Sequence, residues 1–420
     1  MKFRLLILVF VVFFSCEPNI SVIELPSIFC DNMILQRNSE AQFWGSGHNH
    51  ERITVTPSWD GREYKVEIDE DGNWITMLAT PEAGGPYEIS IKGKGDEFVL
   101  KNVVIGDIWL CSGQSNMEWS ANSGIDNAEV EIANANFPNI RLFSVEKTTA
   151  DTPQENVNGT WQVCTPATMQ DFSAVAYFFA KKVQEETGIP IGLIDASWGG
   201  TPAEVWTPER IFEENEKLKE AAKAIEPTDS WPTEPTIVHN AMIAPITPFK
   251  ITGALWYQGE SNVPNAETYQ KLFTEMIGSW RKSWGYDFPF YYSQIAPFKY
   301  GTPEAGVIVR DQQRRAMEFP NTGMVLTSDI CTIDDIHPTN KQDVGLRLAN
   351  VALKEHYKSL DAEVYGPLYK EMIINGNEVE VIFKHAEGLT WKEKGERYLR
   401  LPAKMENFFQ PKRLSEMIRL

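Results

Sequence analysis

Residues 191–200 read IGLIDASWGG, and this stretch decides the fold class. Its first six residues are nearly all apolar, which is typical of a strand buried on both faces of a sheet. The apolar run then stops at a tryptophan and two glycines. Two other stretches have the same form, since residues 105–110 lead into the sequence CSG and residues 254–257 lead into QGE. We therefore expect several buried strands that each end in a glycine-containing turn.

Helices are expected between these strands. Residues 171–187 place apolar side chains at helical spacing, with Asp171 as a cap at the start and Gly188 at the end. Further strands are expected at 290–295 and 324–327, and further helices around 269–280 and 341–356. This alternation predicts a parallel sheet with helices on both faces. In such sheets the active site lies at the carboxyl ends of the strands.

Strand-like sequence flanks this α/β region on both sides. Residues 20–100 contain short alternating or β-branched runs separated by turn signals, which favours a small antiparallel β-sandwich. Strand patterns return after about residue 358. We expect a sandwich at 20–100, an α/β domain at 101–357 and a short C-terminal β segment at 358–396.

Residues 1–16 have the features of a bacterial lipoprotein leader. Lys2 and Arg4 give a positive start, an apolar run follows, and Ser15-Cys16 ends it. We expect an exported protein, periplasmic or in the outer membrane, that touches the membrane only through a lipid on Cys16. Plain secretion and a buried first element are the alternatives. The apolar run is too short to span a bilayer as a helix.

The composition excludes several function classes. The chain has 420 residues, more than one compact domain usually holds, and its formal net charge is −19. Such an acidic surface repels phosphate backbones, so we expect no nucleic-acid partner. The sequence has no CxxC pair, HExxH motif, Walker loop or dinucleotide-binding glycine motif. We therefore expect no metal and no cofactor.

The chain has six histidines, and only His337 stands beside carboxylates directly after an expected strand. The candidate nucleophile is Ser115, in a turn after the strand at 105–110. Each residue also has an ordinary structural reading. Ser115 could simply cap the following helix, and the sequence DDIH at 334–337 could be a solvated loop before a helix. The residues alone leave both readings open.

Four blocks of sequence resemble those of the sialate O-acetylesterases, a family of the SGNH-hydrolase superfamily. The similar blocks are GDIWLCSGQSNME at 106–118, SWGGT at 197–201, WYQGESN at 256–262 and DDIHP at 334–338, followed by Asn340 and Lys341. Residues 25–36 are similar to the β domain of that family, and the resemblance covers about residues 22–396. It implies an SGNH-type, flavodoxin-like three-layer α/β fold with a parallel sheet.

The resemblance also implies catalytic roles. Ser115 would attack an acetyl carbonyl, and His337 would take the serine proton and pass it to the departing sugar hydroxyl. Asp334 would hold the imidazole, as the acid of a serine triad does, and Asp335 competes for that role. A Ser–His pair that another group orients is the remaining alternative.

Three donors would stabilise the oxyanion: the backbone N–H groups of Ser115 and Gly200 and the side-chain amide of Gln258. Three further residues are candidates for supporting roles. Asn116 follows the nucleophile, Glu260 either braces its loop or supplies a carboxylate, and Arg310 either reaches an acidic sugar or lies on a solvated helix face. The tryptophans that either stack on sugars or pack in the core are Trp198, Trp206 and Trp256.

The implied function is hydrolysis of O-acetyl esters of sugars, with the 9-O-acetyl group of sialic acid first. The implied partner is an O-acetylated glycan or free sialic acid. An acetylesterase of xylan or pectin side chains is the alternative within the same chemistry. A non-catalytic glycan-binding surface protein is the alternative from another class.

The last residues fit the family pattern poorly. Back-translation of residues 400–412 in a shifted reading frame allows IAGENGKFFSAE, which resembles the family's continuation. We therefore expect a frameshifted tail at 397–420.

Overall fold

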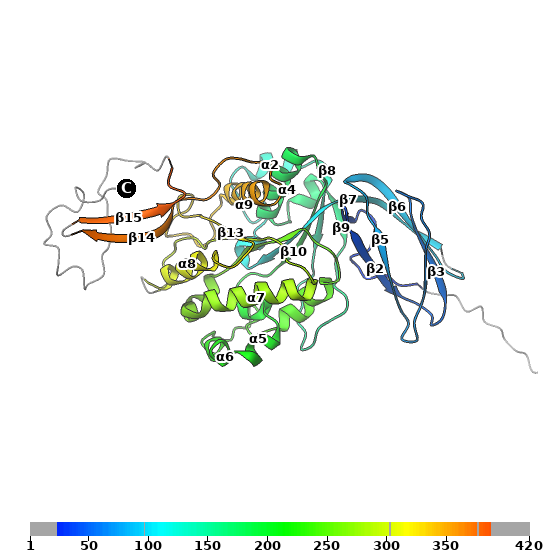
Figure 1. Ribbon diagram of the computed structural model, residues 1–420, viewed down its shortest axis with the longest axis horizontal. Coiled ribbons are helices and arrows are strands. Elements are labelled where there is room, and N and C mark those ends of the chain that lie inside the picture. The colour runs from blue at the N-terminus through cyan, green and yellow to red at the C-terminus, as the bar shows by residue number, and fades with distance from the viewer. Residues whose placement is uncertain (1–22, 96, 302–303, 376–377, 388–420) are drawn as a thin grey trace, which may run out of the picture.

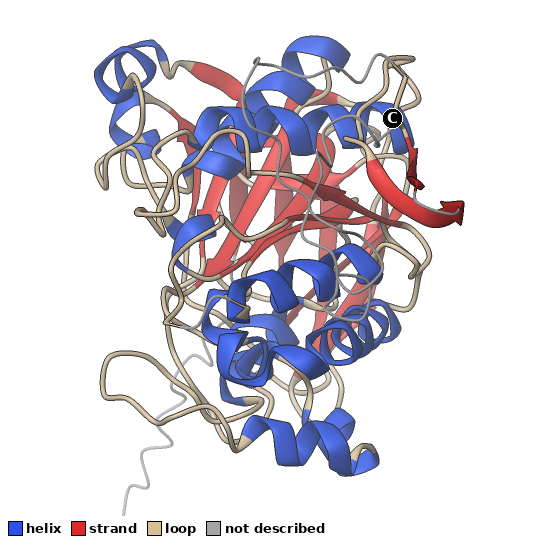
Figure 2. Cartoon of the chain, turned by 90° about the vertical axis from the view of Figure 1, so that its left-hand side faces the viewer, coloured by secondary structure: helices blue, strands red, loops and turns tan. Residues whose placement is uncertain are grey.

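A mostly parallel sheet forms the centre of the structure, which is a computed structural model that describes residues 23–95, 97–301, 304–375 and 378–387. Its strands follow the order β13-β12-β11-β7-β10-β8-β9, and only β8–β9 is antiparallel along this path. The sheet lies in the middle of the molecule (Figures 1 and 2). The strands are β7 (Glu97–Gly113), β8 (Phe137–Ser144), β9 (Trp161–Cys164), β10 (Ile191–Ser197), β11 (Gly253–Tyr257), β12 (Phe290–Ser293) and β13 (Thr322–Val325).

Helices cover both faces of this sheet (Figure 2). Helices α4 (Ala174–Thr187) and α9 (Lys341–Glu355) pack on one face, with α7 (Tyr269–Trp284) and α8 (Ala305–Ala316) on the other. Neighbouring residues of β7 face opposite sides of the sheet. Trp109 belongs to the buried apolar cluster that includes α4 and α9, and Leu110 belongs to the cluster that includes α7 and α8. The expected α/β sheet with helices on both faces is confirmed.

Helix α4 begins two residues later than its expected cap. The side chain of Ser173 accepts a hydrogen bond from the backbone N–H of Ala176 at 3.2 Å, so Ser173 rather than Asp171 is the N-cap. At the other end Gly188 adopts a positive φ of 71°, as expected for a C-terminal cap. The polar sequence before the helix held two suitable caps, and spacing alone did not choose between them.

Shorter helices connect these elements. They are α1 (Ser115–Glu118), α2 (Ala128–Asn134), α3 (Pro166–Met169), α5 (Glu209–Glu214), α6 (Glu216–Ala222), η1 (Ala203–Trp206), η2 (His239–Ile243), η3 (Ala244–Ile246) and η4 (Glu260–Thr268). Among the described residues, no helix has the length and apolar character needed to cross a membrane.

Strand β7 continues through the boundary expected near residue 100. Its first part pairs antiparallel with β6, and its last part pairs in parallel with β10 and β11. The strands before it form two sheets, one of β1, β3, β4 and β6 with β7 and one of β2 with β5. Their bounds are β1 (Ile34–Gln36), β2 (Glu40–Ser46), β3 (Arg52–Pro57), β4 (Tyr64–Glu67), β5 (Asn73–Ala79) and β6 (Gly84–Lys92).

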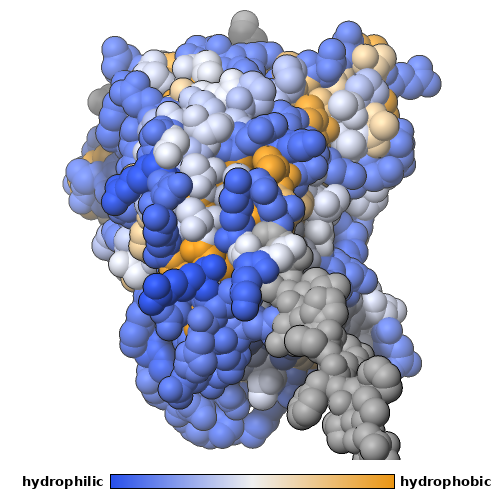
Figure 3. Space-filling model, turned by 90° about the vertical axis from the view of Figure 1, so that its right-hand side faces the viewer, coloured by the Kyte–Doolittle hydropathy of each residue, from blue (hydrophilic) through white to orange (hydrophobic). Residues whose placement is uncertain are grey.

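The two N-terminal sheets share one buried cluster, to which Phe43 and Leu78 contribute from one sheet and Val55 and Ile91 from the other. The end of the molecule that these strands form is mostly hydrophilic on its outside, with scattered apolar patches (Figure 3). The buried cluster also contains Trp256 of β11, so the N-terminal region is joined to the α/β domain through a shared core as well as through β7.

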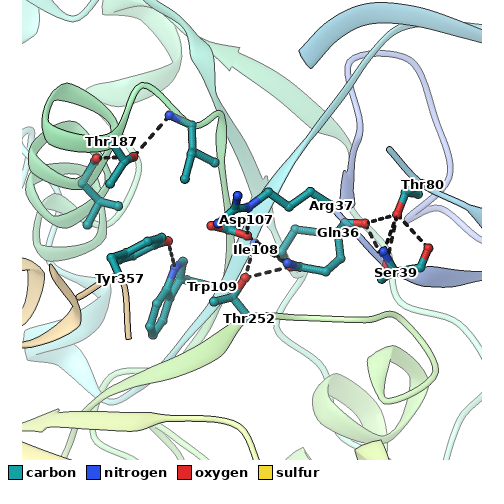
Figure 4. Close-up of polar contacts among 12 residues, drawn as sticks. Gln36, Arg37, Ser39, Thr80, Asp107, Ile108, Trp109, Thr187, Thr252 and Tyr357 are labelled. Atoms are coloured by element: carbon teal, nitrogen blue, oxygen red, sulfur yellow. Dashed lines mark hydrogen bonds and ion pairs between the residues drawn. The ribbon is translucent and has the colours of Figure 1, made fainter. Parts of the chain in front are cut away.

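A polar junction fixes this region to the α/β domain (Figure 4). The buried carboxylate of Asp107 on β7 accepts hydrogen bonds from Gln36 and Arg37, each at 2.9 Å. Gln36 in turn accepts a hydrogen bond from the hydroxyl of Thr252 at 2.8 Å, just before β11. Asp107 lies six residues before the end of β7. These contacts therefore join the two regions and lie away from the carboxyl ends of the strands, where the active site is expected.

Strands β14 (Leu368–Asn375) and β15 (Glu378–Lys384) form an antiparallel pair that projects from the α/β body at the left of Figure 1. They fall within the segment where a short β region was expected. The expected leader at 1–16 and the expected altered tail at 397–420 lie outside the described residues.

Candidate active site

Three of the four sequence blocks meet because their strands end together. The last residue of β7, Gly113, is in register with Ser197 at the end of β10 and with Tyr257 at the end of β11. Gly113 has a φ of +134°, and a Cβ there would lie 2.3 Å from the carbonyl oxygen of Tyr257. Only glycine fits this close backbone approach, and the chain then turns sharply into the next residues.

Ser115 and His337 form a hydrogen-bonded pair. The Oγ of Ser115 lies 2.8 Å from the Nε2 of His337, although the two residues are 222 positions apart. Ser115 is the first residue of α1, whereas His337 lies in the loop between β13 and α9. This is the separation at which imidazole takes the proton of a nucleophilic hydroxyl.

Trp119 holds the ring of His337 in place. The two rings are stacked, with centroids 4.5 Å apart and planes 20° apart. Trp119 lies four residues after Ser115, so one short segment supplies both the hydroxyl and the surface on which the imidazole rests. The sequence contained this residue next to the first block, but its spacing gave no reason to connect it with a distant histidine.

The two candidate acids have different partners. The carboxylate of Asp334 is largely exposed and pairs with the ammonium of Lys299. Asp335 instead accepts a hydrogen bond from the backbone N–H of His337 at 2.8 Å. Burial lowers the pKa of His337, the charge of Lys341 lowers it further, and Asp335 opposes both effects. The structure therefore brings Asp335 to the backbone of His337, whereas Asp334 pairs with Lys299 instead of with the imidazole.

Gly199 and Gly200 lie against the nucleophile. A Cβ on Gly199 would be 3.4 Å from the Cβ of Ser115, and the N–H of Gly199 donates to the carboxylate of Glu118 at 2.6 Å. The hydroxyl of Ser261 donates to the carbonyl of Gly200 at 2.7 Å. The N–H groups of Ser115 and Gly200 donate to no other residue that the structure describes. Both therefore remain available as donors.

Gln258 differs from its expected role. Its side chain is fully buried, and its Nε2 donates to the carbonyl of Thr201 at 3.2 Å and to the Oδ1 of Asn262 at 2.7 Å. Its Oε1 accepts a hydrogen bond from the hydroxyl of Tyr269 at 2.9 Å. Both amide hydrogens are thus used inside the protein, so in this structure Gln258 braces the glycine loop and does not point a donor at an oxyanion.

Asn116 and Glu260 are brought together behind the nucleophile. The Nδ2 of Asn116 donates to Glu260 Oε1 at 2.6 Å and to the carbonyl oxygen of Ile336 at 2.9 Å. Glu260 is buried, and burial raises its pKa. Both residues therefore support the site from behind rather than facing the position of an ester.

Comparisons with known proteins identify the family. Residues 105–354 match the family described as "Carbohydrate esterase, sialic acid-specific acetylesterase". The chain belongs to this family.

Curated relatives and a solved structure extend the similarity beyond that range. The sialate O-acetylesterase of Mus musculus is 30% identical over 82% of this chain and 75% of its own length, and that of Homo sapiens is 31% identical over 80% and 72%. The crystal structure of a carbohydrate acetylesterase from Xanthomonas citri is 34% identical, covers 86% of this chain and 82% of its own, and superposes with a TM-score of 0.79. The chain is thus a carbohydrate esterase.

A pocket lies beside the histidine-bearing loop of this esterase. It has a volume of about 540 Å³, and its lining includes Lys299, Arg310 and Ile333. The guanidinium of Arg310 donates hydrogen bonds to the uncharged oxygens of Gln294 and Ser328, so its charge is held in place without being neutralised by them. Ile333 is four residues before His337, so the pocket and the imidazole of His337 share one loop.

The aromatic residues divide into core and surface groups. Trp206 and Trp256 are fully buried, with ring centroids 6.2 Å apart in an edge-to-face contact, so they pack in the core. Trp198 is partly buried against the same cluster. Trp231 is 39% exposed, and its ring lies where a Cβ on Gly200 would be. Sequence reasoning missed Trp231 because it falls in an irregular stretch outside the four blocks.

Proposed function

We propose that this esterase removes acetyl groups from O-acetylated sialic acid through a covalent acetyl-enzyme on Ser115. The observation that carries the proposal is the 2.8 Å contact between Ser115 Oγ and His337 Nε2 at the carboxyl end of a parallel sheet. His337 removes the hydroxyl proton while Ser115 Oγ forms a bond to the acetyl carbonyl carbon. The carbonyl oxygen becomes an oxyanion beside the N–H groups of Ser115 and Gly200.

The tetrahedral intermediate then collapses. The bond between the carbonyl carbon and the sugar oxygen breaks, and His337 gives its proton to that oxygen, so the sugar alcohol leaves. Water enters, loses a proton to His337 and attacks the acetyl group. Acetate departs, and the proton returns to Ser115. The lowered pKa of His337 supports this cycle, because the imidazole is neutral and able to accept a proton near pH 7.

One feature favours a sugar as the substrate, and a second favours a sugar that carries a carboxylate. Trp231 offers an exposed indole beside Gly200 on which a sugar ring can stack. Arg310 and Lys299 add positive charge to the neighbouring pocket, although the charge of Lys299 is already paired with Asp334. Arg310 is therefore the group we assign to the carboxylate of sialic acid. The acetylated xylose units of xylan are neutral and have no carboxylate for this arginine.

The first experiment compares the wild-type protein with Ser115→Ala on p-nitrophenyl acetate. We expect the variant to lose about a thousandfold or more of kcat, because the nucleophile is gone. Equal rates would exclude Ser115 as the nucleophile, and equal rates at the uncatalysed background would favour a glycan-binding protein without catalysis.

The second experiment measures acetate release from O-acetylated sialic acid and from acetylated xylan. We expect Arg310→Gln to lower kcat/KM on the sialic acid substrate roughly ten- to a hundredfold, the usual worth of a hydrogen bond to a charged group. The same variant should leave p-nitrophenyl acetate hydrolysis unchanged. Arg314→Gln is the matched control, since Arg314 lies on the same helix and pairs with Asp311 at 2.8 Å. Faster turnover of xylan, or an equal effect on both substrates, would reject the sialic acid assignment.

We also propose that the chain is exported and held at the membrane through a lipid on Cys16. The leader sequence supports this proposal. Metabolic labelling with a fatty acid, compared between wild type and Cys16→Ala, tests it. A chain that is exported but unlabelled would be plainly secreted instead.

A further inference from the structure

Lys341 is a buried cation at the N-terminus of a helix, where a positive charge is unfavourable. It is the first residue of α9, and its side chain is fully buried. The N-terminus of a helix carries partial positive charge, and removal of an ammonium from water costs several kcal/mol. The position therefore makes no evident contribution to the stability of the fold, so the contacts of the ammonium must give the reason for it.

The ammonium of Lys341 is linked to the nucleophile segment through one amide. Its Nζ donates a hydrogen bond to Asn116 Oδ1, and the Nδ2 of Asn116 donates to Glu260 and to the carbonyl of Ile336. An ammonium can only donate and a carbonyl oxygen can only accept, so these partners fix the orientation of the amide. The Asn116 amide therefore joins three segments: the one that begins at Ser115, the block at 256–262 and the loop that bears His337.

Lys341 also shares an aromatic neighbour with the catalytic imidazole. Its Nζ lies 5.6 Å from the ring centroid of Trp119, the ring on which His337 stacks. A second ring, that of Tyr257, lies 5.7 Å from the same Nζ. The ammonium is thus held close to the imidazole, where a fixed positive charge opposes protonation of the histidine.

The charges around these two groups are few. The charged groups that act on His337 are Lys341 from α9 and Asp335 from its own loop. Those that act on Lys341 are Glu260 from η4 and Asp335, together with the thiol of Cys331. Burial lowers the pKa of Lys341, the two carboxylates oppose this change, and the resulting pKa is about 7. Glu260 and Asp335 therefore favour the protonated form of Lys341.

We propose that Lys341 is a positioning residue of the esterase, which fixes the Asn116 amide between Ser115 and the histidine loop and whose charge keeps His337 in its neutral, proton-accepting form. The inference rests on the proposed function, since it assigns a role in proton transfer between Ser115 and His337. It explains why a buried cation and a buried carboxylate are placed behind the nucleophile.

The test is Lys341→Met in the full chain, which removes the charge and keeps the length of the side chain. We expect kcat on p-nitrophenyl acetate to fall about 10- to 100-fold because the nucleophile and base lose their fixed alignment. We also expect the acid limb of the kcat/KM profile to move to higher pH, since the imidazole becomes easier to protonate. NMR titration of ¹³C-labelled histidine, assigned with His337→Gln, should show the same upward movement without any substrate. Lys354→Met, in the last turn of the same helix, should change neither.

A second variant keeps the proposal open to refutation if the single variant fails to fold. Lys341→Met/Glu260→Gln removes both buried charges, a change that is often neutral or stabilising. We expect this variant to melt at or above the wild-type temperature and still to show the upward movement of the His337 titration. A folded variant with an unchanged His337 titration would overturn the proposal. If Ser115→Ala stays active, the proposed function fails, whereas the NMR result still measures the coupling of Lys341 and His337.

Discussion

The two halves of the candidate site are held in different ways. The nucleophile segment, residues 112–119, follows a central strand and is fixed by backbone contacts, such as the hydrogen bond from the N–H of Gln114 to the carbonyl of Tyr257 at 3.0 Å. The histidine loop, residues 326–340, follows the edge strand β13 and is partly exposed. Near His337 it is held by the side chains of Trp119 and Asn116, and a backbone hydrogen bond from Asp126 N–H to the carbonyl of Thr339 holds its far end.

This difference indicates which changes each half tolerates. The position of Ser115 depends on glycine backbone geometry, so a single added methyl group should disturb it. The position of His337 depends on stacking and on one amide, so it should respond gradually to changes in charge and ring contacts. The following predictions test this contrast, from the largest expected effect to the smallest.

His337→Gln should have the largest effect on activity. Loss of the general base should lower kcat on p-nitrophenyl acetate about 10²- to 10⁴-fold. If the two halves act as one unit, Ser115→Ala/His337→Gln should be no slower than Ser115→Ala alone, because residues of one catalytic unit are not additive. A double variant that loses the product of both single effects would mean that the two residues act independently.

Gly113→Ala should damage the nucleophile segment through the backbone. The added Cβ would lie 2.3 Å from the carbonyl oxygen of Tyr257 at a φ that disfavours side chains. We expect a loss of about 3 kcal/mol or more in the free energy of unfolding, with most of the activity. Gly188→Ala is the control, because it shares a positive φ but has no heavy atom within 4 Å of the added Cβ. It should cost about 1 kcal/mol and leave kcat unchanged.

The two neighbouring acids of the histidine loop should differ. Asp335→Asn removes the charge that raises the pKa of His337, so the acid limb of the kcat/KM profile should move to lower pH, with a fall in kcat of about tenfold. Asp334→Asn breaks only an exposed pair with Lys299 and should change kcat less than about twofold. A larger effect from Asp334→Asn would restore Asp334 as the orienting acid.

The strand ends could be predicted well from the sequence because they depend on residues that are adjacent in the chain. A buried strand needs a continuous apolar run, and the turn after it needs glycine, so Gly113 and Gly200 could be placed before the structure. Ser115 and His337 followed from the position of the site in parallel sheets together with the family resemblance.

The remaining roles depend on side-chain directions that spacing does not give. Asp334 and Asp335 are adjacent, and only the path of an exposed loop decides which one faces His337. The donors of Gln258 are used by Thr201 and Asn262, which the sequence could not reveal. Trp119 reaches His337 only because distant segments fold together.

The smallest effect on catalysis is expected from a histidine outside the site. This histidine allows the pH dependence of folding stability to be separated from the pH dependence of activity. His239 is buried, and burial lowers its pKa from 6.5 to about 4. The unfolded chain takes up the proton first as the pH falls, so the folded state loses up to about 3 kcal/mol between pH 6.5 and 4 and nothing more below that range.

Chemical denaturation across this pH range measures the loss, and His239→Gln should remove that part of the pH dependence. The acid limb of kcat/KM, which belongs to His337, should stay where it is in that variant. If the acid limb moves with His239, then the fall in activity at low pH reflects unfolding, and the titration of the catalytic base must be measured by NMR alone.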